Sequence, residues 1–263
     1  MTRKRQNELE RLITERGFVR VTDASLELGV SEVTVRGDLT ALQRRGRVTR
    51  VHGGAMPAGA AEPSLEAALD RDGAAKVAIG RAAARLVNNG DSIYVDAGST
   101  AMALAVALVD RHELHDVVVV TSGLTIALAL EPALPRFTVV VTGGTLRPLQ
   151  HSLVSPFAAP MLDALTLDIA FIGCNGIHPT GGVTNINLAE AEIKSRVRGR
   201  SHRGILLADA TKLGRIDLAA IGTADGYDTL VTAGMAAGMA AGTVVDDLRA
   251  MGMTVIVADK LAP

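Results

Sequence analysis

Residues 28–55 read LGVSEVTVRGDLTALQRRGRVTRVHGGA. Ser31 can cap a helix that spans Glu32–Arg45 and ends at Gly46, because a serine side chain accepts a hydrogen bond from a free N–H group of the first turn. Three apolar residues at helical spacing form the expected buried stripe of this helix: Val35, Leu39 and Leu42. The segment Arg47–Val51 then leads into a His-Gly-Gly turn, which is typical of a β-ribbon.

Two further helices are predicted before this stretch. The first spans Gln6–Arg16 and places three apolar residues at helical spacing: Leu9, Leu12 and Ile13. Phe18–Val21 is a short β-prone run, and Thr22 or Asp23 can cap a second helix that ends at Gly29. Helix, short strand, helix, tight turn, helix and ribbon in this order indicate a winged helix-turn-helix, a fold that places its last helix in the major groove of DNA.

Candidate DNA contacts lie on the exposed face of the third predicted helix and in the ribbon. A rotation of about 100° per residue separates the buried stripe from the opposite face, which can reach phosphates and base edges. The candidates are Ser31, Val33, Thr34, Arg36, Gly37, Thr40, Arg44, Arg47, Arg50 and His52. The alternative interpretation is a solvated, charged helix of a small α-helical domain.

The net charge of the whole chain disfavours DNA binding, but the distribution of charge along the chain favours it. The 263 residues hold 27 Lys and Arg against 28 Asp and Glu, a net charge of −1. Residues 1–52 hold 11 basic and 7 acidic residues, a net of +4, so the remainder has a net charge of −5. An aromatic fraction of only 2% disfavours a single-strand binder that stacks bases.

No metal, cofactor or membrane segment is expected. The six histidines are scattered without ligand spacing, and the lone cysteine, Cys174, excludes an internal disulfide and suits a reducing cytoplasm. No signal peptide is evident at the start of the sequence. The longest uncharged apolar run, residues 229–245, contains glycines and threonines, and we expect a buried Ala-rich helix there.

The second domain is expected to be an α/β domain with a mostly parallel sheet. A Gly-, Ala- and Pro-rich stretch predicts a linker over residues 56–74, which separates a DNA-binding domain (1–55) from a larger domain (75–263). A helix over Ala75–Val87 opens the larger domain. Seven short β-prone runs follow, with helix-compatible stretches between most of them: 92–97, 117–121, 137–142, 167–173, 204–210, 229–233 and 254–258.

Hydroxyl groups, glycines and charged side chains follow several of these strands. Parallel sheets bind ligands beyond the carboxyl ends of their strands, and a helix N-terminus there favours an anion. The candidate ligand-binding residues from these turns are Asp96, Gly98, Ser99, Thr100, Thr121, Ser122, Gly143, Gly144, Asp209 and Lys212. This chemistry suits a phosphorylated polyol, whereas the absence of GxxxxGK[ST], and of a GxGxxG after a strand, disfavours a nucleotide.

The sequence resembles the DeoR family of bacterial transcriptional regulators over nearly its whole length. The N-terminal resemblance lies in a leading Arg near Arg5, the LGVS turn, the TVRGDL helix and the RVHGGA wing. DAGST, VVTSG, TGGTLR, SLVSP, FIGCNGIHPTGGVTNINLAEAEIK and LLADATKLGR are similar to the family's sensor domain, in this order. The chain departs from the family pattern at Gly37, where a second Arg is usual, at Ser122, which replaces Asn, and at Ser155, which replaces Gly.

The resemblance implies a sensor domain similar to the folds of ribose-5-phosphate isomerase and CoA-transferase, which binds a phosphorylated sugar as effector. It adds Glu190 and Lys194 to the candidate effector-binding residues. Two structural alternatives stay open: Glu190 and Lys194 can form an exposed i, i+4 helix pair, and Asp96 can brace the turn at Gly98.

The sequence therefore predicts a cytoplasmic transcriptional regulator, a repressor of carbohydrate catabolism that a phosphorylated sugar releases from double-stranded operator DNA. A dimer or tetramer is expected, because two half-sites multiply specificity. The alternatives are a sugar-phosphate isomerase on the same fold and a DNA-binding protein with a degenerate sensor domain.

Overall fold

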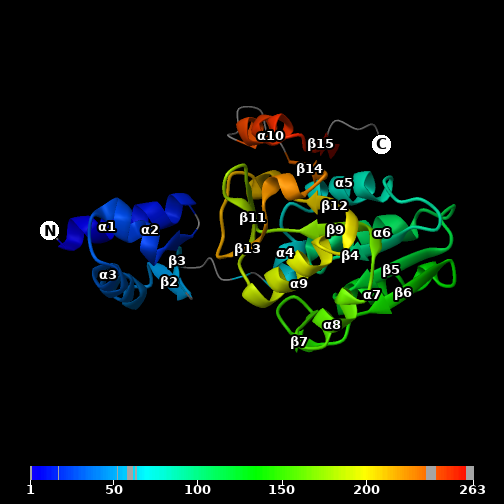
Figure 1. Cartoon of the computed structure of the whole chain (residues 1–263), viewed down its shortest axis with the longest axis horizontal. Helices are drawn as coiled ribbons and strands as arrows, with labels where there is room; N and C mark the ends of the chain where they lie inside the picture. Colours follow the sequence, from blue (N-terminus) through cyan, green and yellow to red (C-terminus); the bar gives the residue numbers. More distant parts are fainter. Residues whose placement is uncertain are drawn as a thin grey trace.

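The N-terminal domain combines three helices with a three-stranded sheet (Figure 1). The structure is a computed structural model and describes residues 2–16, 18–51, 53–57, 62, 64–234 and 241–258. In chain order the domain contains α1 (Thr2–Arg16), β1 (Val19–Arg20), α2 (Val21–Leu28), α3 (Glu32–Arg44), β2 (Val48–Val51) and β3 (Gly54–Pro57). Strand β3 lies between β1 and β2 and is antiparallel to both. The predicted winged helix-turn-helix is confirmed.

The core of this domain contains the predicted stripe of α3. Leu9, Val35 and Leu39 are at most 2% exposed and belong to one apolar cluster that draws on all three helices. Helix α2 differs from the prediction, since it begins at Val21 without a side-chain cap. The N–H group of Val21 instead donates to the carbonyl of Gly53 in the wing, at 2.9 Å. Helix α2 therefore begins at the residue that follows β1, with its first N–H group bonded to the wing.

The segment predicted as a linker, residues 56–74, contains secondary structure in its described part. Strand β3 continues to Pro57, and a short helix, α4 (Leu65–Leu69), follows with Ser64 as its N-cap. Leu65 is 2% exposed, and its N–H group donates to the carbonyl of Leu149 at 2.9 Å. Helix α4 is therefore anchored on the larger domain.

The larger domain is built on a seven-stranded parallel sheet. Its strand order is β15-β14-β12-β9-β4-β5-β6, and each neighbouring pair is parallel. The strands are β4 (Ser92–Val95), β5 (Val117–Thr121), β6 (Phe137–Val141), β9 (Leu167–Gly173), β12 (Ser201–Leu207), β14 (Thr229–Thr232) and β15 (Thr254–Val257). All seven predicted strands are present. The prediction of one helix over residues 229–245 is wrong, because the run begins with the buried strand β14 and only residues 241–245 belong to a helix, α10, while residues 235–240 lie outside the described residues.

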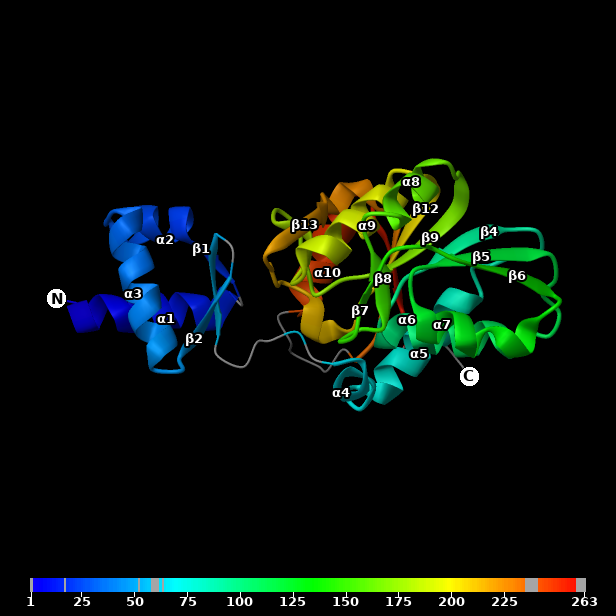
Figure 2. The ribbon, with the colours of Figure 1, turned by 90° about the horizontal axis from the view of Figure 1, so that it is seen from below.

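Helices cover both faces of the sheet (Figure 2). One face packs against α5 (Gly73–Ala84), α6 (Ser99–Val109) and α7 (Leu124–Ala129), and the other against α8 (Ala158–Asp163), α9 (Leu188–Arg198) and α10 (Ala241–Ala250). Each side has its own apolar cluster. None of the helices in the described ranges has the length and apolar character needed to cross a membrane.

Two smaller sheets lie near the carboxyl ends of the parallel strands. The first is a hairpin of β7 (Thr145–Arg147) and β8 (Ser152–Val154). The second contains β10 (Gly176–His178), β11 (Gly182–Asn185) and β13 (Ala219–Gly222). Short 3-10 helices complete the domain: η1 (Glu131–Ala133), η2 (Ala210–Lys212) and η3 (Ala224–Gly226).

The order of the strands reverses between β4 and β9. From β4 the chain proceeds through β5 and β6 on one side and then returns to β9, β12, β14 and β15 on the other. In open parallel sheets such a reversal opens a crevice beyond the strand ends, because the connections leave in opposite directions. A binding site is therefore expected beyond the carboxyl ends of β4 and β9.

Candidate functional site

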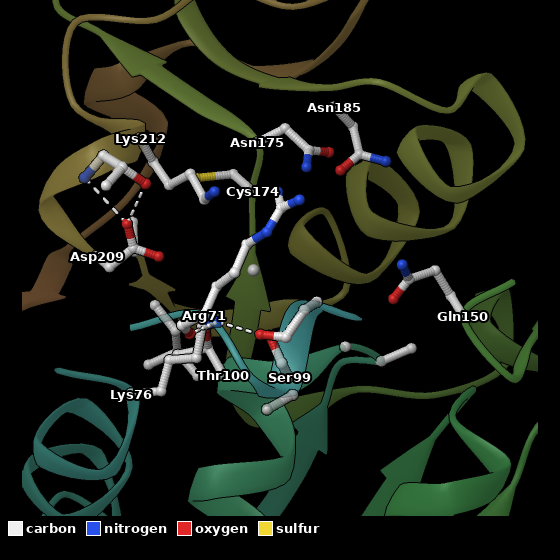
Figure 3. Close-up of a pocket in the computed structure, with 18 of the residues that line it drawn as sticks. Arg71, Lys76, Ser99, Thr100, Gln150, Cys174, Asn175, Asn185, Asp209 and Lys212 are labelled. Carbon is white, nitrogen blue, oxygen red and sulfur yellow. Dashed lines mark hydrogen bonds between the residues drawn. The ribbon is translucent and has the colours of Figure 1, made fainter. Parts of the chain in front are cut away.

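A cavity of about 320 Å³ lies at this reversal point. The turns that follow β4, β9 and β12 contribute Gly98, Asn175 and Asp209 to its lining, and the segment before α5 contributes Arg71 (Figure 3). Its volume falls in the range of small-molecule sites, which is roughly 300–1,000 Å³. The cavity is thus large enough for a metabolite.

One end of the cavity is suited to an anion. Helix α6 begins here with Ser99 and Thr100, and its free N–H groups attract negative charge. Gly98, before the helix, has a φ of +105°, a conformation that L side chains rarely adopt. Within the described part of the chain, neither Arg71 nor Lys212 has a carboxylate at ion-pair distance, whereas Arg215 pairs with Asp217 at 3.5 Å.

Local hydrogen bonds hold the backbones near Lys212 and Arg71, the two cations without a carboxylate partner among the described residues. Lys212 is the last residue of η2, whose N-cap, Asp209, accepts a hydrogen bond from the N–H group of Thr211 at 2.9 Å. The segment that contains Arg71 is held by Lys76, because the ammonium group of Lys76 donates to the backbone carbonyls of Ala68 and Arg71, each at 2.5 Å. Figure 3 shows the Arg71 side chain extending into the cavity toward Cys174.

The other part of the lining is rich in amide side chains. Gln150, Asn175 and Asn185 all line the cavity, and Gln150 lies opposite Lys212 across it (Figure 3). The side-chain amide oxygen (Oδ1) of Asn175 accepts from the backbone N–H group of Ile186 at 3.0 Å, which fixes the orientation of the amide. Amide groups both donate and accept, so this part of the cavity suits hydroxyl groups.

Glu190 and Lys194 form part of a buried polar network, so the exposed helix pair is excluded. Lys194 is 6% exposed, and its ammonium group lies 3.0 Å from the carboxylate of Asp96 and donates to the carbonyl of Gly173 at 3.0 Å. Burial alone lowers the pKa of Lys194, but the carboxylates of Asp96 and Glu190 outweigh it and the pKa is raised. Burial raises the pKa of Glu190, yet Lys194 and Arg147 reverse this, so that pKa is lowered.

Asp96 braces the turn after β4. Its two carboxylate oxygens accept from the N–H groups of Ala97, at 2.8 Å, and Gly173, at 2.9 Å. Together with Lys194 these partners occupy the carboxylate, and Asp96 is not among the residues that line the cavity. The structural alternative for Asp96 thus agrees with the geometry.

Seven of the candidate effector-binding residues line the cavity: Gly98, Ser99, Thr100, Glu190, Lys194, Asp209 and Lys212. Thr121, Ser122, Gly143 and Gly144 do not. The hairpin of β7 and β8 covers their turns, since the carbonyl of Ser122 accepts from the N–H group of Leu153 at 2.8 Å. The hydroxyl group of Ser122 is bonded to that of Tyr94 at 2.8 Å.

Sequence reasoning missed Arg71, Gln150, Asn175 and Asn185 as lining residues. Asn175 lies two residues after the end of β9, so its position after a strand was an available signal. Arg71 and Gln150 come from the predicted linker and from the β7–β8 hairpin, and their positions depend on packing between distant segments.

Cys174 is unsuited to nucleophilic chemistry. Its side chain is buried, and burial raises the pKa of its thiol to about 12. A thiol attacks as its thiolate, which is scarce at neutral pH when the pKa is so high. In the described residues no group of three or more His, Cys, Asp or Glu side chains is arranged to hold a metal ion.

The candidate DNA-binding face of α3 is largely exposed. Val33 is 76% exposed, and Ser31 caps the helix by accepting from the N–H group of Thr34 at 3.3 Å. Arg36 pairs with Glu32 at 2.6 Å. In the wing, Arg50 donates to the hydroxyl group of Thr40 at 2.8 Å, so the wing is joined to α3.

The remaining basic candidates lie beside this face. Arg44 is exposed in the last turn of α3, and Arg47 pairs with Glu10 at 2.6 Å. His52 lies outside the described residues. Both described side chains can add positive charge for phosphate contacts, which fix the register of a protein on DNA.

A buried carboxylate joins α1 to α3. Asp38 is 4% exposed and accepts from Arg5 at 2.6 Å and from Gln6 at 2.9 Å. We expect Asp38→Ala to lower the free energy of unfolding of the N-terminal domain by about 3 kcal/mol, since two hydrogen bonds to a buried carboxylate are lost. Thermal unfolding measures this; Glu27→Ala, in an exposed pair with Arg16, is the control, and equal effects of both changes would contradict a special role for Asp38.

Gly37 faces open space on α3. A Cβ atom at this position would meet no atom of the described residues within 4 Å, so their packing does not require glycine here. We expect Gly37→Ala to stabilise the domain by up to ~1 kcal/mol, because alanine favours the helix, and Gly37→Arg to tighten binding to any DNA by adding a cation. Unfolding and DNA titrations at two salt concentrations test this; weaker DNA binding by Gly37→Ala would show instead that the backbone approaches the DNA closely.

A winged helix-turn-helix followed by a ligand-sized cavity in a parallel α/β domain is the architecture of a two-domain transcriptional regulator. A family model described as the DeoR-like helix-turn-helix domain matches residues 5–58, and one described as the DeoR C terminal sensor domain matches residues 71–233. The chain belongs to the DeoR family of transcriptional regulators.

Curated relatives agree with this assignment. The chain is 34% identical over 231 residues to the HTH-type transcriptional regulator GolR of Listeria innocua, covering 87% of this chain and 89% of GolR. It is 31% identical to the HTH-type transcriptional repressor CsqR of Escherichia coli, over 79% of this chain and 78% of CsqR. It is 30% identical to the lactose phosphotransferase system repressor of Staphylococcus aureus, over 81% and 85%. These proteins are regulators, so the isomerase alternative is not supported and the chain is not an enzyme.

Solved structures similar to the chain include a D-ribose-5-phosphate isomerase in complex with phospho-erythronic acid, with a TM-score of 0.40 and 18% identity over 52% of each chain. Ribose 5-phosphate isomerase A of Methanocaldococcus jannaschii has a TM-score of 0.37 and 21% identity, over 52% of this chain and 53% of the isomerase.

Proposed function

We propose that the protein represses an operon for carbohydrate catabolism and leaves its operator when a phosphorylated sugar occupies the cavity. The observation that carries this proposal is a set of groups that line one cavity: Arg71 and Lys212, which have no carboxylate partner among the described residues, and the first turn of α6 with Ser99 and Thr100. Guanidinium, ammonium and free N–H groups are the donors that bind phosphate in proteins. The amide side chains supply partners for sugar hydroxyls.

The family and its members support the choice of ligand and of target. The larger domain matches a sensor-domain model, and a relative in Staphylococcus aureus is named for repression of a lactose phosphotransferase system. A repressor of such an operon gains from sensing a phosphorylated intermediate, because that compound accumulates only when the sugar is taken up.

The proposed effector contacts fall into two groups. Those that touch the phosphate are Gly98, Ser99, Thr100, Arg71 and Lys212. Those that face the sugar are Gln150, Asn175, Asn185 and Glu190. Asp209 and Lys194 act by positioning, since Asp209 caps the helix that bears Lys212 and Lys194 pairs with Asp96.

The proposed DNA contacts are those of the exposed face of α3 and of the wing. Arg36 and Thr34 read base edges in the major groove, Val33 makes an apolar base contact, and Arg44, Arg47 and Arg50 contact phosphates. The protein acts in the cytoplasm as a dimer or tetramer, which matches two half-sites of an operator.

Titration of a panel of phosphorylated sugars into the complex of the protein with operator DNA tests this function. One compound is expected to lower operator affinity, while its unphosphorylated form has no effect. Linkage requires that this compound bind the DNA-free protein more tightly than the complex. If no compound acts while DNA binding is intact, the alternative of a degenerate sensor domain is correct.

A further inference from the structure

The segment that joins the two domains forms part of the wall of the cavity. Glu62, Ala68, Arg71 and Asp72 line the cavity, and all four precede α5. Only residues 58–61 separate the end of β3, at Pro57, from Glu62. A ligand in the cavity therefore contacts the connection to the DNA-binding domain directly.

Glu62 is held in the cavity by Arg147. The guanidinium group of Arg147 lies 2.5 Å from the carboxylate of Glu62 and also pairs closely with Glu190. The three side chains are 12%, 14% and 10% exposed for Glu62, Arg147 and Glu190. One guanidinium group thus serves two partly buried carboxylates, and Lys194 is the other cation that acts on both.

Of the two carboxylates, that of Glu62 is held less firmly. The carboxylate of Glu190 also accepts hydrogen bonds from the hydroxyl group of Ser152, at 2.7 Å, and from the side-chain amide of Asn185, at 3.4 Å. Burial and the charge of Glu190 raise the pKa of Glu62, whereas Lys194 and Arg147 keep that of Glu190 low. An anion added to the same cavity repels both carboxylates, and Glu62 has fewer contacts to oppose its departure.

We propose that Glu62 is a latch: its ion pair with Arg147 holds the interdomain segment against the sensor domain, and an anion bound at Arg71 and Lys212 expels it. This inference rests on the proposed function, because it requires an anionic effector in the cavity.

Release of Glu62 lengthens the tether of the DNA-binding domain. With Glu62 in place, five residue steps connect it to Pro57, which reach at most about 18 Å. Without it, the next anchor is Leu65, whose N–H group is bonded to the carbonyl of Leu149, and eight steps reach roughly 29 Å. A longer tether lowers the effective concentration of a second DNA-binding domain at its half-site, so operator affinity falls.

The test compares Glu62→Gln with Glu66→Gln in the full-length protein. Both changes remove one negative charge, but Glu66 is exposed on α4 and faces His151 at 3.4 Å. Calorimetric titration with inorganic phosphate is expected to give three- to tenfold tighter binding for Glu62→Gln and no change for Glu66→Gln. Without phosphate, Glu62→Gln is expected to bind a DNA site selected from a random pool as weakly as the phosphate-saturated wild type does.

The outcomes separate the latch from the function on which it rests. If Lys212→Gln loses phosphate while Glu62→Gln binds it as the wild type does, or more weakly, the cavity is an anion site and the latch is wrong. If neither the wild type nor Glu62→Gln binds phosphate or any sugar phosphate, the proposed function fails and the latch fails with it. Thermal unfolding of each variant verifies that it is folded.

Discussion

Replacing Lys212 by Gln is expected to weaken binding of the phosphorylated sugar by about 10- to 150-fold. The change removes a cation without a carboxylate partner in the described residues, and a hydrogen bond to a charged group contributes about 1.5–3 kcal/mol. The backbone of η2 stays in place, because the cap from Asp209 to Thr211 does not involve the Lys212 side chain. Calorimetry with the active compound, or with inorganic phosphate, measures the loss.

Lys212→Arg is the matched control, since it keeps the charge at the same backbone position. It is expected to retain most of the affinity, because a guanidinium group also binds phosphate. Release from operator DNA is expected to follow the affinity for the sugar phosphate, so that the Lys212→Gln variant requires a correspondingly higher concentration of the compound to leave the operator. Unchanged affinity in Lys212→Gln would place the anion elsewhere in the cavity, with Arg71 as the next residue to change.

The sequence identified those parts of the cavity that follow directly from a strand. Gly98, Ser99 and Lys212 come within a few residues of the ends of β4 and β12, so strand prediction alone brings them to the same edge. Arg71 could not be found in this way, because its place in the cavity depends on Lys76 holding the end of α4. No local sequence pattern encodes that contact.

The rule that ligands bind beyond strand ends also predicted effector-binding residues after β5 and β6 that do not line the cavity. Thr121 ends β5 at the ligand-binding edge and Ser122 follows it, but the β7–β8 hairpin is hydrogen-bonded to this turn, and Gly123 forms a β-bridge with Ser152. The hairpin belongs to the connection between β6 and β9, and its direction is set by tertiary packing. Strand ends therefore predict where a site can form, and the connections decide which ends stay open.

Replacing Arg36 by Ala is expected to weaken binding to the specific operator by about 1–3 kcal/mol, which is roughly 5- to 150-fold, if the side chain reads a base. Arg36 lies one turn into α3, on the flank of the exposed face, where a recognition helix presents its contacts. Its ion pair with Glu32, at 2.6 Å, must be exchanged for the DNA contact. Because both side chains are about half exposed, this exchange costs little.

The comparison with Arg44→Ala distinguishes base reading from simple attraction to phosphate. Arg44 is exposed in the last turn of the same helix, so the two variants remove the same charge from one element. Arg44→Ala is expected to weaken binding to operator and random DNA equally and to reduce the slope of log affinity against log salt by about 1. Arg36→Ala is expected to affect the operator far more than random DNA, because only the operator carries the base that Arg36 contacts. If Arg36→Ala instead lowers both affinities equally, Arg36 contacts a phosphate and the base specificity of α3 must come from Thr34 and its neighbours.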